Sequence, residues 1–171
     1  MPQRGEFVRA LGCFLLCAVL LLGACAPNAG ETLDVFERGF SCEVAGECNG
    51  VGFAARYEVA PVCCDGVMPL TVIFYAPEAL EGTRLCRGAD GAVMLCVGEM
   101  TATMGADAFA PLLNAFGDFG GIRRIAVSKE GQTVLECGNA TVTFGADGTP
   151  LRLQREGLTL DITAWLGAES V

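Results

Sequence analysis

The feature that most constrains the fold of this chain is a series of dipeptides that pair glycine with a polar residue. Glycine adopts a positive φ at little cost, so such pairs favour tight hairpin turns between strands. The pairs are Asn49-Gly50, Asp65-Gly66, Glu81-Gly82, Asp90-Gly91, Glu130-Gly131, Gly138-Asn139, Asp147-Gly148 and Glu156-Gly157. In the C-terminal third they recur roughly every 8 to 12 residues, which predicts an antiparallel meander.

Apolar and polar residues alternate between these turns. Leu158, Leu160 and Ile162 share one side of an extended segment, and the residues between them are polar. Similar alternation, or a short apolar run, predicts further strands at 40–45, 51–60, 70–75, 124–128, 141–144 and 151–154. We therefore expect a sheet with one apolar face and one hydrated face.

One segment departs from the strand pattern and predicts a helix. Phe109, Leu112, Leu113 and Phe116 are spaced as the apolar stripe of an amphipathic helix between Asp107 and Gly117. Pro111 suits the first turn of that helix, and Gly117 suits its end. The stripe indicates ordinary core packing against the sheet.

This single helix is too small to cover the predicted sheet. About 10 helical residues cover on the order of 150 Å². Eight strands, each about 17 Å long and spaced by about 4.8 Å, present on the order of 650 Å² per face. The sheet must therefore close into a barrel and fill its own interior, or stay partly open with an apolar concavity for a ligand or partner.

The first 24 residues have the layout of an export signal. Arg4 and Arg9 precede an uncharged, mostly apolar run at 10–23, which is shorter than the roughly 20 residues of a membrane span. The run ends in Leu22-Gly23-Ala24-Cys25, which resembles the lipobox of bacterial lipoproteins. The resemblance implies cleavage before Cys25 and attachment of diacylglycerol and palmitate to that residue. An ordinary secretory signal with a chance cysteine is the alternative.

This resemblance sets the expected domain organisation: a lipoprotein signal peptide at 1–24, a tether at 25–33 and one β domain at 34–171. The mature protein is then expected at the extracytoplasmic face of the cell membrane, anchored through Cys25. Removal of residues 1–24 changes the net charge from −9 to −10. Such a chain repels phosphate backbones and anionic head groups, so nucleic acid is not an expected partner.

A second resemblance concerns the order of elements over about residues 35–165. The chain has strands, then the segment from Phe74 to Gly82, a hairpin at Asp90-Gly91, a helix containing Pro111-Leu112-Leu113, and a final group of strands after Phe144. This order resembles small lipoproteins with a LolA/LolB-type fold. The resemblance implies a mainly β (α+β) domain, with a strongly curved antiparallel sheet or incomplete barrel and one short helix. It also implies an inner side that accepts acyl chains or other apolar cargo.

The cysteines admit several interpretations. Outside the signal and Cys25, the chain has Cys42, Cys48, Cys63, Cys64, Cys86, Cys96 and Cys137. Exported domains often contain disulfides, and the odd number leaves at least one thiol without an intramolecular partner. Two bridges suggest themselves: Cys42 with Cys48, expected to flank a turn, and Cys86 with Cys96, which flank the Asp90-Gly91 hairpin and need a three-residue loop or a bulge. Alternatively, the thiols serve as small buried apolar groups.

Catalytic chemistry finds little support in the sequence. The chain has no histidine, which excludes Ser-His and Cys-His nucleophile pairs, and no Cys-x-x-Cys pair typical of zinc sites. We expect no enzyme activity, no catalytic residue, no metal and no cofactor. Two hypotheses remain: a tethered binding or chaperone module for lipid or a lipoprotein segment, and a structural lipoprotein that docks another envelope protein and has no ligand cavity.

Overall fold

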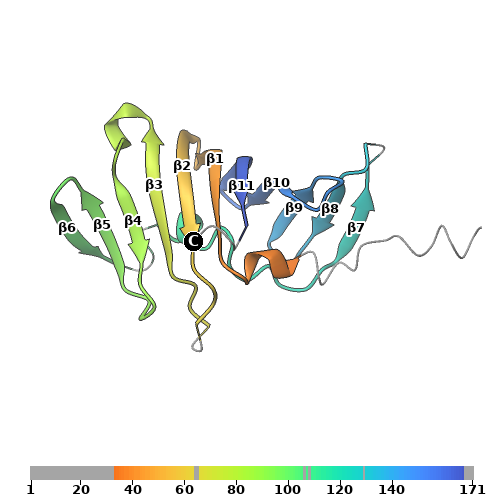
Figure 1. The fold of residues 1–171 in the computed structure, drawn as a ribbon, viewed down its shortest axis with the longest axis horizontal. Helices are drawn as coiled ribbons and strands as arrows, with labels where there is room; N and C mark the ends of the chain where they lie inside the picture. Colours follow the sequence, from red (N-terminus) through yellow and green to blue (C-terminus); the bar gives the residue numbers. More distant parts are fainter. Residues whose placement is uncertain (1–32, 64–65, 106, 108, 129, 168–171) are drawn as a thin grey trace, which may run out of the picture.

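The chain forms one eleven-stranded antiparallel sheet (Figure 1). The computed structural model describes residues 33–63, 66–105, 107, 109–128 and 130–167. The strands are β1 (Phe40–Cys48), β2 (Val51–Val59), β3 (Leu70–Ala76), β4 (Arg84–Arg87), β5 (Val93–Val97), β6 (Met100–Met104), β7 (Arg124–Val127), β8 (Thr133–Glu136), β9 (Ala140–Phe144), β10 (Pro150–Arg155) and β11 (Leu158–Leu166). Two 3-10 turns, η2 (Asp34–Phe36) and η3 (Glu78–Leu80), and a short helix complete the described elements.

The sheet consists of two meanders joined at its centre. Strands β1 to β6 follow one another to one edge, and β7 to β11 to the other, in the order β6-β5-β4-β3-β2-β1-β11-β10-β9-β8-β7. The junction is the pairing of β1 with β11, from Ser41 opposite Leu166 to Cys48 opposite Leu158. The sheet is curved and open, with β6 and β7 at opposite ends (Figure 1). The expected mainly β, antiparallel fold class is confirmed, although the area comparison assumed too few strands.

The first strand is longer than the predicted range of 40–45, whereas the turn after it lies where predicted. β1 continues to Cys48, and the chain reverses at Asn49 and Gly50, whose φ values of 50° and 82° suit a tight hairpin turn. Gly46 therefore lies within the strand. A Cβ atom at Gly46 would come within 2.7 Å of the Phe53 ring and 2.8 Å of Leu160, so this glycine makes room for side chains.

One face of the sheet, here called the inner face, contains the core. Its central row across the first meander is Tyr57, Val72 and Leu85, all fully buried. The corresponding row across the second meander consists of Leu135, Val142, Leu153 and Leu160, also fully buried. Burial decreases toward both ends of the sheet, where Ile125 on β7 is 51% exposed and Met100 on β6 is 73% exposed. The inner face is thus covered at its centre and open at its edges.

The helix is shorter than predicted. α3 (Ala110–Leu113) has four residues, and Asn114 caps its C-terminal end. The predicted apolar stripe is nevertheless correct, since Leu112, Leu113 and Phe116 are buried. An isolated short helix has little stability of its own, so packing decides its length: beyond Asn114 the chain turns and inserts the Phe116 ring beside Tyr57, with ring centroids 5.2 Å apart. No described helix is long and apolar enough to cross a membrane.

Candidate binding cavity

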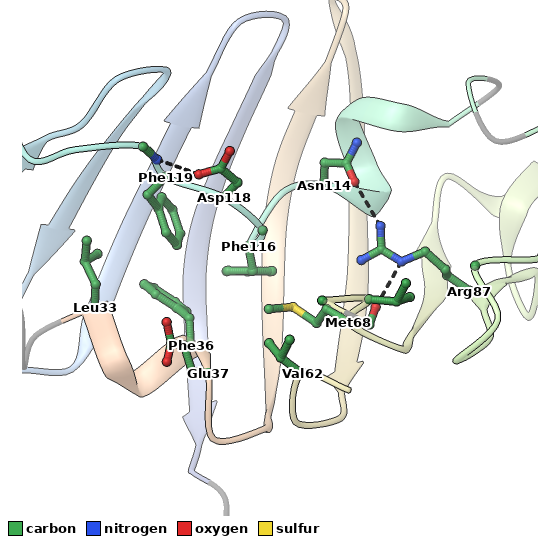
Figure 2. Close-up of a pocket in the computed structure, with 15 residues that line it drawn as sticks. Leu33, Phe36, Glu37, Val62, Met68, Arg87, Asn114, Phe116, Asp118 and Phe119 are labelled. Carbon is green, nitrogen blue, oxygen red and sulfur yellow. Dashed lines mark hydrogen bonds between the residues drawn. The ribbon is translucent and has the colours of Figure 1, made fainter. Parts of the chain in front are cut away.

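A cavity of about 560 Å³ lies on the inner face. It opens between η2, the connection from β2 to β3, the end of β4 and the segment that follows α3 (Figure 2). Its lining residues are Leu33, Phe36, Glu37, Val62, Gly66, Val67, Met68, Arg87, Gly91, Asn114, Phe116, Gly117, Asp118, Phe119 and Gly120. The cavity thus combines four segments that are distant in sequence.

The floor of the cavity is aromatic. Phe36, Phe116 and Phe119 are at most 8% exposed, and the Phe36 ring centroid lies 5.5 Å from that of Phe116 and 5.1 Å from that of Phe119. Beneath them, Phe40 stacks on Trp165 with centroids 4.5 Å apart. These rings fill the middle of the sheet, so the cavity is a shallow apolar site above a packed core.

Apolar side chains face this floor from the connection between β2 and β3. Met68 and Val62 point toward Phe116 across the cavity (Figure 2). Met68 is 7% exposed, whereas Val62 is 42% exposed and lies near the mouth. The Cys63 N–H donates a hydrogen bond to the Val67 carbonyl at 2.8 Å. This bond extends the hairpin of β2 and β3 and fixes the positions of Val62 and Met68.

Arg87 is the one cationic residue among the described residues that line the cavity. Its Nε donates to the Met68 carbonyl at 2.9 Å, and its Nη1 donates to Asn114 Oδ1 at 2.9 Å (Figure 2). Burial lowers the pKa of Arg87 below its usual range, yet an arginine stays charged at any physiological pH. The exposed carboxylates of Glu37 and Asp118 complete a polar rim around an apolar floor.

A second arginine, Arg155, does not line the cavity but binds the segment after α3 that forms one of its walls. Arg155 donates through Nη2 to the Gly117 carbonyl and, at 3.0 Å, to the Asp118 carbonyl. Its guanidinium also lies 5.0 Å from the centroid of Phe119, within cation–π range. Burial lowers the pKa of Arg155. The segment after α3 has no regular structure, and these contacts position it against β10.

The cysteine bridges expected from sequence do not match the strand register. Cys42 and Cys48 lie in the same strand, β1, so the expectation that they flank a turn is wrong. Six extended residues separate them by about 20 Å, well beyond the reach of a disulfide. Cys86 lies opposite Met94, and Cys96 lies opposite Arg84, so these two are diagonal neighbours on the other face. All four are free thiols in the structure, as are Cys63 and Cys137.

The other sequence predictions concern lipidation, metal binding and the residues of the binding site. Cys25, the expected lipidation site, and Cys64 lie outside the described residues, so lipidation stays a prediction. Within the described residues, no group of three or more His, Cys, Asp or Glu side chains could hold a metal ion. The residues that form the cavity, such as Phe36, Met68 and Arg87, carry no recognisable motif, and the sequence did not single them out.

The buried thiol and phenol of the core give a pH-dependent prediction. Burial raises the pKa of Cys42 from 9.0 to about 12 and also raises the pKa of Tyr57. Below pH 9 these groups are neutral in both states and leave stability unchanged. Above about pH 9 for Cys42 and above pH 10 for Tyr57, the unfolded chain loses a proton that the native chain keeps, so the free energy of unfolding should fall by up to about 1.4 kcal/mol per pH unit for each group.

Urea unfolding measured between pH 7 and pH 11 checks this prediction. Cys42→Val should reduce the alkaline slope, and Cys42→Val combined with Tyr57→Phe should reduce it further. An alkaline slope that is the same in all three proteins would contradict the assignment.

Comparisons with known proteins show likenesses of fold. No family model matches the chain, and no curated protein matches it significantly. A crystal structure of an uncharacterised conserved protein from Thermus thermophilus is similar over 81% of this chain and 86% of that chain, with 16% identity and a TM-score of 0.49. MucB is similar over 82% of this chain, with 14% identity and a TM-score of 0.49. This chain spans about three fifths (59%) of MucB.

A LolA superfamily protein from Nitrosomonas europaea is also similar, over 80% of this chain and 90% of that chain. The identity is 10% and the TM-score is 0.47. At 10–16% identity, these three structures resemble this chain in fold alone.

Proposed function

We propose that this chain is a membrane-tethered, non-catalytic binding module that holds an apolar segment of a lipid or lipoprotein in the inner-face cavity. The observation that carries the proposal is the cavity of about 560 Å³ above the floor of Phe36, Phe116 and Phe119. This volume falls within the range of about 300–1,000 Å³ found for small-molecule sites. The alternative, a docking lipoprotein with a filled sheet, requires no such cavity.

The chemistry of the lining selects the kind of ligand. An acyl chain or an apolar side chain can lie on the rings and on Met68, where it leaves water. The polar end then remains at the rim, near Arg87, Glu37 and Asp118. Because two of these three side chains are acidic, a strongly anionic head group gains little there. The site therefore suits an apolar tail better than a phosphate.

Location is the second part of the proposal. The Leu22-Gly23-Ala24-Cys25 segment supports lipid attachment at Cys25 on the extracytoplasmic face of the cell membrane. Only a few residues separate Cys25 from Leu33, which lines the cavity. The cavity therefore stays close to the membrane that anchors the chain, and its ligand must come from that membrane or from a protein beside it.

Val62 offers a direct test, because it lines the cavity but is exposed enough to be changed without loss of fold. Val62→Asp should weaken binding of a fluorescent fatty acid at least about fivefold, since the carboxylate loses water when an apolar chain covers it. A chain that begins at residue 26 lacks the apolar run and the predicted lipidation site, so it suits a fluorescence titration without detergent.

Val51→Asp is the matched control. Val51 is 61% exposed at the start of β2 and lies outside the cavity. This variant should bind the probe as the wild type does, and both variants should unfold within about 0.5 kcal/mol of the wild type. Equal binding by the wild type and Val62→Asp would place the probe elsewhere and refute the proposed site.

A further inference from the structure

The two end strands of the sheet differ in how they are protected. An edge strand offers unpaired N–H and C=O groups to any other strand, and proteins commonly block it with charge or proline. β7 has two arginines at its start: Arg123 precedes it, and its first residue, Arg124, pairs through Nη1 with Glu136 Oε1 of β8 at 3.4 Å. β6 has the sequence Met-Thr-Ala-Thr-Met, without charge or proline, and Met100 to Thr103 are exposed. Of the two described end strands, β6 is thus the one that has no charged residue to block pairing.

The sequence of β6 is the same in both directions. Antiparallel pairing of two copies about Ala102 sets Met100 opposite Met104 and Thr101 opposite Thr103 of the second copy. A two-fold symmetric interface requires this kind of self-complementary surface. Threonine pairs across strands are favourable, and no like charges meet within the strand. The occupant that fits this edge best is a second copy of the same chain.

The backbone of β6 is oriented for this pairing. The two-residue turn at Gly98 and Glu99 joins Val97 to Met100, which face each other in the register of β5 and β6. Such a turn closes on a hydrogen-bonded pair, and these pairs alternate with non-bonded ones along an antiparallel ladder. Thr101 and Thr103 therefore direct their N–H and C=O groups to the open edge. Two copies would form about four backbone hydrogen bonds.

Pairing would also cover apolar surface that the fold leaves exposed. On the inner face, Met100 is 73% exposed and Val97 is 44% exposed, and they lie opposite each other at the end of the sheet. In the two-fold arrangement Met100 meets Met104 of the second copy, so the apolar face continues across the junction. Main-chain bonding and side-chain burial therefore favour the same partner.

We propose that two copies of this chain associate through antiparallel pairing of their β6 strands, which joins their sheets into one. This inference is independent of the ligand. The test places charge at Ala102, which lies on the two-fold axis and is exposed in the single chain. Two full-length copies with different tags are co-expressed and extracted in detergent, and co-precipitation of one tag with the other is measured. Ala102→Lys in both copies should lower co-precipitation at least about fivefold, because two like charges then face each other.

The charge exchange distinguishes symmetric pairing from damage to the fold. A chain with Ala102→Lys combined with a chain with Ala102→Glu should recover co-precipitation to the wild-type level. Thr103→Pro, which removes an N–H directed to the open edge but keeps the bonds to β5, should also lower it. Val127→Lys, in the opposite edge strand, is the matched control and should have no effect.

Three results would overturn the proposal. One is wild-type co-precipitation no greater than that of the Ala102→Lys pair. Another is a Lys–Glu combination that recovers no more than the Lys–Lys pair, as expected if another protein occupied the edge. The third is undiminished pairing of Thr103→Pro chains.

Discussion

Phe36→Ala should lower the free energy of unfolding by about 3–5 kcal/mol, the range for removal of a buried phenylalanine side chain. Phe36 is 1% exposed, and its ring centroid lies within 6.1 Å of those of Phe40, Phe116, Phe119, Phe144 and Trp165. η2 has only three residues, and Phe36 is the one of them whose side chain is buried. For a domain of this size we expect the Tm to fall by about 10 °C.

Val35→Ala is the matched control, since Val35 is the neighbouring apolar residue of η2 but is only half-buried. It should cost about 1 kcal/mol or less. Thermal unfolding followed by circular dichroism compares the two variants. If Phe36→Ala unfolds at the same temperature as Val35→Ala, the Phe36 side chain does not anchor η2 to the core and does not form part of the cavity floor.

Cys25→Ala should abolish incorporation of labelled palmitate entirely, because the lipobox interpretation places the acylated group on this residue. Each buried methylene contributes about 0.8 kcal/mol to membrane attachment, and two or more chains give a stable anchor where one gives a marginal anchor. The measurement is palmitate labelling in a bacterium that processes lipoproteins, followed by the mass of the mature N-terminus.

Cys17→Ala provides the control within the same apolar run. It should keep both the label and cleavage before Cys25. A wild-type chain without label, or a Cys25→Ala chain that retains it, would refute the lipid anchor and favour an ordinary secretory signal.

The sequence predicted the strands and turns well, since both depend on local chemistry. Alternation at Leu158, Leu160 and Ile162 identified β11, and the glycine pairs identified most of the hairpins. Short strands with weak alternation were missed, notably β6, whose residues are exposed on both sides. The predicted helix was too long, because the same apolar spacing fits both a continuous helix and a single helical turn followed by an irregular segment.

Properties that depend on long-range register could not be predicted. The pairing of β1 with β11 joins residues more than a hundred positions apart, and no local pattern specifies it. The same limitation applies to Cys86 and Cys96, whose relation depends on the loop length between β4 and β5. The cavity arises from packing: the positions of Arg87 and Met68 follow from the hydrogen bond between them, which sequence spacing does not indicate.

Native mass spectrometry of the chain from residue 26, secreted and purified without detergent, is the sharpest test of ligand binding in the cavity. We expect a bound species with the mass of a lipid or acyl compound on the wild type and on Val51→Asp, and at least about fivefold less of it on Val62→Asp. A wild-type protein that carries no such species and takes up no fluorescent fatty acid would show that the cavity is not a lipid-binding site.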